Sequence, residues 1–149
     1  MIRNNLISLG IHLFILLMSV LLIAAESNPV YLFVVVLLAF AAYFLLGYQF
    51  LQPKNMGMMN FLSVGLVSLI GLLIGLYCWL VPGQMGFNWM IFLAYNVPSL
   101  VLAQIFQFSP NPAGTLWFFL VPSLLLWLSL QVKDLRNRRR VRSSETMKQ

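Results

Sequence analysis

The sequence has very little charge for its length. Only three acidic and nine basic residues occur among 149, so charged residues make up 8% of the chain. A soluble globular domain is about one quarter charged. With 61% hydrophobic residues and a mean hydropathy of +0.91, the chain lacks the polar surface that a water-soluble fold needs. The composition therefore predicts an all-α integral membrane protein with a single domain, because no polar block is long enough to fold separately.

Cysteine and histidine are equally scarce, with one of each. A lone Cys78 excludes an internal disulfide, a CxxC redox pair and a cysteine-based zinc cluster. His12 has neither a GxSxG serine nor an HExxH pattern beside it, so the common hydrolase and zinc-protease signatures are missing. The acids Glu26, Asp134 and Glu145 are too widely divided for two-carboxylate chemistry. We expect no enzyme, no metal and no cofactor.

Long apolar stretches dominate what remains. Four of them are predicted to span the membrane, at residues 6–25, 30–51, 61–81 and 113–130. About twenty apolar residues in a helix cross a hydrocarbon core of about 30 Å. The first stretch resembles a secretory signal, but its apolar run is longer than usual and Ile23 fits a small-x-small cleavage site poorly. We interpret it as a retained anchor.

The fifth stretch, residues 87–108, is long enough to cross but carries several polar residues. They are Asn88, Asn96, Ser99, Gln104 and Gln107, together with Pro98. Two topologies follow from this segment. If it is a re-entrant or interfacial apolar helix, the bundle has four transmembrane helices. If it crosses, the bundle has five transmembrane helices and its termini face opposite sides.

The basic residues favour four spans. Arg3 precedes the first stretch, Lys54 lies between the second and third, and the other seven basic residues follow the last. With four spans all nine lie on one side, as the positive-inside rule requires. Residues 1–132 then form the transmembrane bundle, and residues 133–149 form a basic cytoplasmic tail. The tail is predicted to contact anionic lipid headgroups, at about 1 kcal/mol for each basic residue, rather than nucleic acid. These predicted contacts are Lys133, Arg136, Arg138, Arg139, Arg140 and Arg142.

A polar stripe runs along the first span. At about 100° per residue, its four members fall within roughly 40° of one line on the helix. They are Ser8, His12, Ser19 and Glu26. An ionisable residue inside a membrane is a functional candidate, so the stripe could line a proton or cation path. Alternatively it faces neighbouring helices and only helps them pack.

The third span carries a face of small residues, namely Ser68, Gly71, Gly75 and Cys78. Small residues allow two helices to approach closely, either within one chain or between protomers. Pro98 and Pro122 both stand in Val-Pro-Ser-Leu and are predicted to kink or break their helices. Paired broken helices occur at transporter sites, although four shared residues are also common by chance in apolar sequence.

These patterns suit packing better than chemistry. The leading hypothesis is a non-catalytic, multi-pass protein of a bacterial plasma membrane, with both termini cytoplasmic. It would act through protein or lipid contacts, as a subunit, a regulator or an immunity-type protector. Its partners would be membrane lipids and another membrane protein or a second copy of itself. The alternative is an oligomeric small transporter, channel or holin-like pore, in which the His12 stripe forms the lining.

Overall fold

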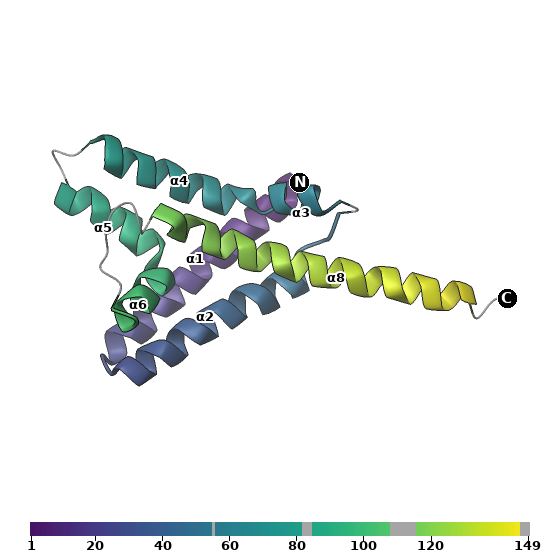
Figure 1. The fold of residues 1–149 in the computed structure, drawn as a ribbon, viewed down its shortest axis with the longest axis horizontal. Coiled ribbons are helices and arrows are strands. Elements are labelled where there is room, and N and C mark those ends of the chain that lie inside the picture. The colour runs from purple at the N-terminus through teal and green to yellow at the C-terminus, as the bar shows by residue number, and fades with distance from the viewer. Residues whose placement is uncertain (55, 82–84, 108–115, 147–149) are drawn as a thin grey trace.

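The computed structural model describes residues 1–54, 56–81, 85–107 and 116–146. Within these ranges every regular element is a helix, which confirms the all-α prediction (Figure 1). The first two elements, α1 (Ile2–Ala25) and α2 (Pro29–Phe50), form a long hairpin. Asn28 caps α2, because its Oδ1 accepts a hydrogen bond from the Val30 N–H at 2.9 Å. Pro29 begins the helix, where its missing N–H is not needed.

The third apolar stretch consists of two helices rather than one. A short α3 (Gly57–Leu62) is followed by a turn at Ser63 and Val64 and then by α4 (Gly65–Leu80). The turn is closed locally, since the Val64 N–H donates to the Phe61 carbonyl at 3.1 Å. With 16 residues, α4 alone is about 24 Å long, which is shorter than a hydrocarbon core.

The fifth apolar stretch, for which the sequence left two topologies open, is sharply bent. Its halves are α5 (Met85–Tyr95) and α6 (Val97–Ile105), and the axes of residues 88–95 and 97–105 meet at 91°. Asn96 lies at the bend, and Pro98 occupies the first turn of α6. A proline there removes no bond inside the helix, so Pro98 starts a new helix rather than kinking an existing one. In Figure 1, α5 returns from the far end of α4, and α6 then turns aside.

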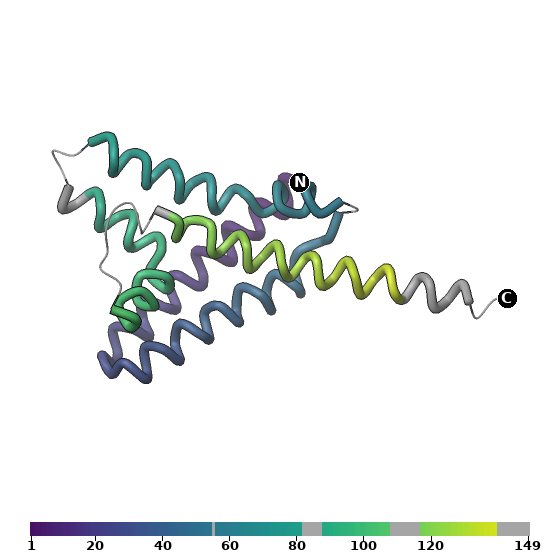
Figure 2. The backbone as a smooth tube through the Cα atoms, in the orientation of Figure 1, coloured from purple at the N-terminus to yellow at the C-terminus, as the bar shows by residue number. Residues whose placement is uncertain are grey.

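The last element is longer than the predicted span. A 3-10 turn, η2 (Leu116–Phe119), leads into α8 (Leu120–Thr146), which contains 27 residues. Pro122 is the third residue of α8, so it too lies in the first turn of its helix. The helix continues through the basic segment and extends past the other helices (Figure 2). The tail therefore begins as a rigid continuation of the span.

Three helices of the described chain are long and apolar enough to cross a membrane. They are Ile2–Ala25, Pro29–Phe50 and Trp117–Arg139, and the bent α5–α6 pair raises the number to four if it is one span. Several apolar helices of this length are consistent with a membrane protein.

The most extensive contact inside the bundle joins α2 to α8, which lie side by side (Figure 1). Gly47 allows this approach: a Cβ added there would collide with the Ser129 side chain and lie 3.0 Å from Leu126 Cδ2. Tyr43, Leu126 and Leu130 are almost fully buried in the same core. Outward-facing side chains of the helices are largely apolar and exposed, as expected where lipid is the solvent.

Candidate functional site

A polar junction joins three segments at one end of the bundle. Asn4, which is 3% exposed, donates from Nδ2 to the Gln52 carbonyl at 2.8 Å and to Ser63 Oγ at 3.3 Å. Its Oδ1 accepts from the Gln52 N–H at 3.3 Å. The start of α1 is therefore bonded to both the end of α2 and the turn before α4. We call this end of the molecule the basic end, because Arg3, Lys54 and Lys133 all belong to its segments.

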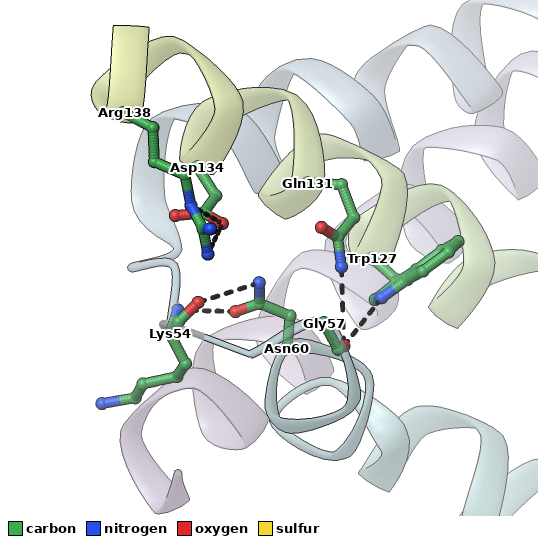
Figure 3. Close-up of polar contacts among 7 residues, drawn as sticks. All are labelled: Lys54, Gly57, Asn60, Trp127, Gln131, Asp134 and Arg138. Carbon is green, nitrogen blue, oxygen red and sulfur yellow. Dashed lines mark hydrogen bonds and ion pairs between the residues drawn. The ribbon is translucent and has the colours of Figure 1, made fainter. Parts of the chain in front are cut away.

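Asn60 and α8 hold the loop at the basic end in place (Figure 3). Asn60 accepts from the Lys54 N–H at 2.6 Å and donates to the Lys54 carbonyl at 3.2 Å. From α8, Trp127 Nε1 and Gln131 Nε2 donate to the Gly57 carbonyl at 3.1 and 3.5 Å. These bonds attach α3 to the last helix and leave the Lys54 side chain pointing away from the contacts drawn.

Several predicted headgroup contacts have partners inside the chain. Lys133 donates to the carbonyls of Leu51 and Gln49 at 2.7 and 3.3 Å, which satisfies the end of α2. Arg136 donates to the Tyr48 hydroxyl at 2.9 Å, and Arg138 pairs with Asp134 at 2.9 Å. The Arg139 side chain is exposed, whereas those of Arg140 and Arg142 lie outside the described residues. The contact of all six basic residues with lipid headgroups stays a prediction.

The polar stripe of α1 points inward along most of its length. Ser8, His12 and Ser19 are buried, whereas Glu26 is exposed and already outside the helix. His12 lies about midway along α1, where its Nδ1 and the Tyr43 hydroxyl are 2.7 Å apart. The Tyr95 ring packs on the imidazole with 4.4 Å between centroids. Four elements therefore meet around His12, because Tyr95 also donates to the Val67 carbonyl of α4 at 2.9 Å.

Three buried polar atoms near the bent segment and His12 have no hydrogen-bond partner among the described residues. They are His12 Nε2, Asn88 Nδ2 and Asn96 Oδ1. Leaving such a group unpaired costs about 1–3 kcal/mol, so each one is a candidate point for binding a polar ligand, and His12 Nε2 is the one of the three that can bind a proton. At His12 the imidazole is hydrogen-bonded to the Tyr43 hydroxyl, and no carboxylate is among its described contacts. This pair can donate and accept hydrogen bonds, but it has no carboxylate base beside it.

The small-residue face of α4 is occupied by other parts of the same chain. A Cβ added at Gly71 would lie 2.7 Å from Phe119 Cβ and 3.1 Å from Tyr95 Cε1. Ser68 Oγ donates to the Phe119 carbonyl at 2.8 Å, and Cys78 Sγ donates to the Asn88 carbonyl at 2.9 Å. Gly75 is buried on the same face. Within the described chain this face packs against α5 and the turn before α8, and contact between protomers stays a prediction.

Sequence reasoning missed several residues that hold these elements together. Asn4 precedes Ser8 by one helical turn, so extending the stripe backward by four residues would have found it. Ser123 accepts from the Ser68 N–H at 3.2 Å and donates to the Val64 carbonyl at 3.0 Å, linking α4 to α8. Nothing in the sequence pairs these two segments, because the contact depends on how the bundle assembles.

Comparison with known proteins supplies no function. No protein family, no curated protein and no solved structure matches the chain. Within the described residues, no three histidine, cysteine, aspartate or glutamate side chains are grouped so that they could hold a metal ion. Any functional proposal therefore rests on the geometry of the chain itself.

Proposed function

We propose that the chain forms a four-span bundle in a bacterial plasma membrane, in which α3 and α4 together make the third span, α5–α6 is a re-entrant segment and both termini are in the cytoplasm. Arg3, Lys54 and Lys133 lie at the same end of the bundle through the Asn4 and Leu51 contacts. Glu26 lies at the opposite end of α1. Retention of basic residues on the inner side supports this orientation. The 91° bend at Asn96 supports a segment that enters and leaves on one side.

Within that bundle, we propose a non-catalytic role exercised through protein or lipid contacts, as a subunit, a regulator or an immunity-type protector. The observation that carries this proposal is how the buried polar side chains are used. Asn4, Ser68 and Ser123 each bond to main-chain groups of a neighbouring segment. Such bonds hold helices together where lipid gives no hydrophobic drive for association. The polar residues therefore stabilise a compact body whose outer surface is available to partners.

The outer surface fits a membrane-embedded contact. Exposed leucines recur along the outward sides of α1, α2 and α4, for example at Leu17, Leu38 and Leu73. Such surfaces adjoin lipid in a free bundle and the helices of a partner in a complex. The chain would then contribute shape and apolar surface rather than reactive groups.

A second function, as an oligomeric transporter, channel or holin-like pore, is favoured by one observation. His12 Nε2 and Asn96 Oδ1 are unpaired deep in the bundle, close to the bend between α5 and α6. Broken helices with polar groups near the membrane midplane are typical of transporter sites. Several copies would be needed, because four spans of one chain leave little room for an aqueous path.

Flux measurements separate the two functions. Purified protein in liposomes is expected to release no protons, ions or dye above the level of empty liposomes, because most buried polar groups are bonded to the main chain. The assay compares wild type with His12→Leu and with the lipid-facing control Leu13→Ala. Robust wild-type flux that His12→Leu abolishes and Leu13→Ala retains would replace the contact function with the transport function. Isolation of one stable membrane partner in stoichiometric amount would support the contact function directly.

A further inference from the structure

We propose that a groove at the basic end binds one acyl chain of an anionic phospholipid from the inner leaflet, with the phosphate held near Arg3 and Lys54. This inference rests on the proposed topology and on the lipid-contact function, and it adds a defined site and a ligand class. Two independent features carry it: an apolar groove that is open beside the bundle, and positive charge at the end where that groove begins.

The groove lies between the start of α1, the α3–α4 turn and the start of α8. Its volume is about 420 Å³, and its walls are mostly apolar. Asn5 and Leu62 lie at the basic end, where Asn5 Nδ2 donates to the Leu62 carbonyl at 3.2 Å. Leu72 and Phe119 lie deeper. The remaining lining residues are Phe61, Gly65, Leu66, Ser68, Leu69 and Leu120.

The direction of the groove matches that of a lipid chain. Gly65, Leu69 and Leu72 are spaced four and then three residues apart, so they lie on one face of α4. From Gly65 to Leu72 the helix rises about 10 Å. The groove therefore leads from the charged end of the bundle toward the membrane interior. An acyl chain that lies along α4 would fill it and bury the apolar walls.

Gly65 and Gly71 differ in what surrounds them, and this difference identifies the open side of α4. A Cβ added at Gly65 would meet no atom within 4 Å, whereas one added at Gly71 would collide with Phe119. Gly71 faces the packed interior, and Gly65 faces the groove. A large side chain can therefore be introduced at Gly65 to occupy the groove without first displacing its neighbours.

Positive charge accumulates where the groove begins. Arg3 is exposed in the first turn of α1, the turn that also carries the groove residue Asn5. Lys54 has its main chain fixed by Asn60, and its side chain extends away from those contacts (Figure 3). Of the two acidic side chains described, Asp134 is paired with Arg138 and Glu26 lies at the far end. A phosphodiester at this end therefore meets cations, and its attraction adds to that of the leaflet.

Exposed methionines on the neighbouring α3 suit the same surface. Met58 is 69% exposed and lies one helical turn before the groove residue Leu62. Methionine is flexible and fills irregular apolar gaps well. Apolar side chains beside basic ones are the combination that lies at the boundary between headgroups and acyl chains. The basic end therefore offers contacts to both parts of a phospholipid.

Native mass spectrometry of the full chain, released from detergent micelles, tests the site. Phosphatidylglycerol and phosphatidylcholine with identical acyl chains are added in equal amounts. We expect retention of one phosphatidylglycerol at least fivefold over phosphatidylcholine, with this preference lost in the Arg3→Gln/Lys54→Gln double variant. The control Lys148→Gln removes a positive charge that is not among the predicted headgroup contacts, and it is expected to keep most of the preference. Equal retention of the two lipids by wild type would overturn the proposal, as would equal losses in the two variants.

Filling the groove supplies the second part of the test. Gly65→Phe is expected to abolish lipid retention, whereas Gly10→Phe, at another glycine whose added Cβ meets no neighbour, is expected to preserve it. A wild-type measurement guards against misfolding of Gly65→Phe: a phosphatidylglycerol with a photoreactive acyl chain should cross-link to the Leu69–Leu72 region. Cross-links confined to other helices would reject the groove. Because these assays measure lipid binding and not flux or partner isolation, their failure would leave the flux and partner results for the proposed function unchanged.

Discussion

Gly71→Ala is expected to lower the free energy of unfolding by about 1–3 kcal/mol, although alanine is the better helix former. The added methyl group would lie 2.7 Å from Phe119 Cβ and 3.4 Å from Phe119 Cα. The position of Phe119 Cβ is set by the main chain, so a change of side-chain rotamer cannot relieve the first contact. The strain should separate α4 from the 3-10 turn that leads into α8.

The control for this prediction is Gly10→Ala, since a Cβ at Gly10 would meet no atom within 4 Å. That change should leave stability unaltered or raise it by up to about 1 kcal/mol through helix propensity. Unfolding of both variants by denaturant or heat in one detergent gives the comparison. Equal stability of the two variants would mean that α4 does not pack closely on Phe119.

Asn4→Leu is expected to destabilise the basic end by about 1–3 kcal/mol for each main-chain group of Gln52 that it leaves unpaired. Leucine has the same number and branching of side-chain heavy atoms as asparagine, so the loss comes from hydrogen bonding rather than from a cavity. The Gln52 carbonyl and N–H would both lose their Asn4 partner, and Ser63 Oγ would keep only its bond to the Asn60 carbonyl. The start of α1 should then detach from the turn before α4.

Asn137→Leu makes the same chemical change at an exposed position of α8 and should shift stability by less than about 0.5 kcal/mol. Amide hydrogen exchange localises the effect, and faster exchange in Asn4→Leu should centre on residues 60–66. If Asn4→Leu unfolds like wild type and its exchange at residues 60–66 is unchanged, the polar junction at Asn4 is refuted.

The first hairpin could be predicted closely from the sequence because its signals are local. The predicted spans 6–25 and 30–51 correspond to Ile2–Ala25 and Pro29–Phe50. Asn28 and Pro29 mark a helix start through capping and backbone geometry, which need no distant partner. The inward direction of Ser8, His12 and Ser19 follows from the helical period alone. Glu26 does not continue the buried stripe, because α1 ends at Ala25.

Other features could not be predicted because they depend on contacts between distant segments. The turn at Ser63 and Val64 interrupts an apolar stretch that appears continuous, and Asn4 and Asn5 of α1 stabilise it by bonding to Ser63 and to the Leu66 N–H. The use of Lys133 to satisfy the end of α2 likewise requires α2 and α8 to be neighbours. From its place in the basic tail, Lys133 was predicted only to contact lipid headgroups.

The account depends on one spatial claim: the basic end faces the cytoplasm, and the turn between α1 and α2 faces outward. Cysteine labelling of intact cells with a membrane-impermeant maleimide tests it, in a Cys78→Ala background carrying Ser27→Cys, Lys54→Cys or Ser143→Cys. We expect Ser27→Cys to react in intact cells, and the other two variants to react only after the membrane is permeabilised. Labelling of Lys54→Cys from outside intact cells would contradict the topology.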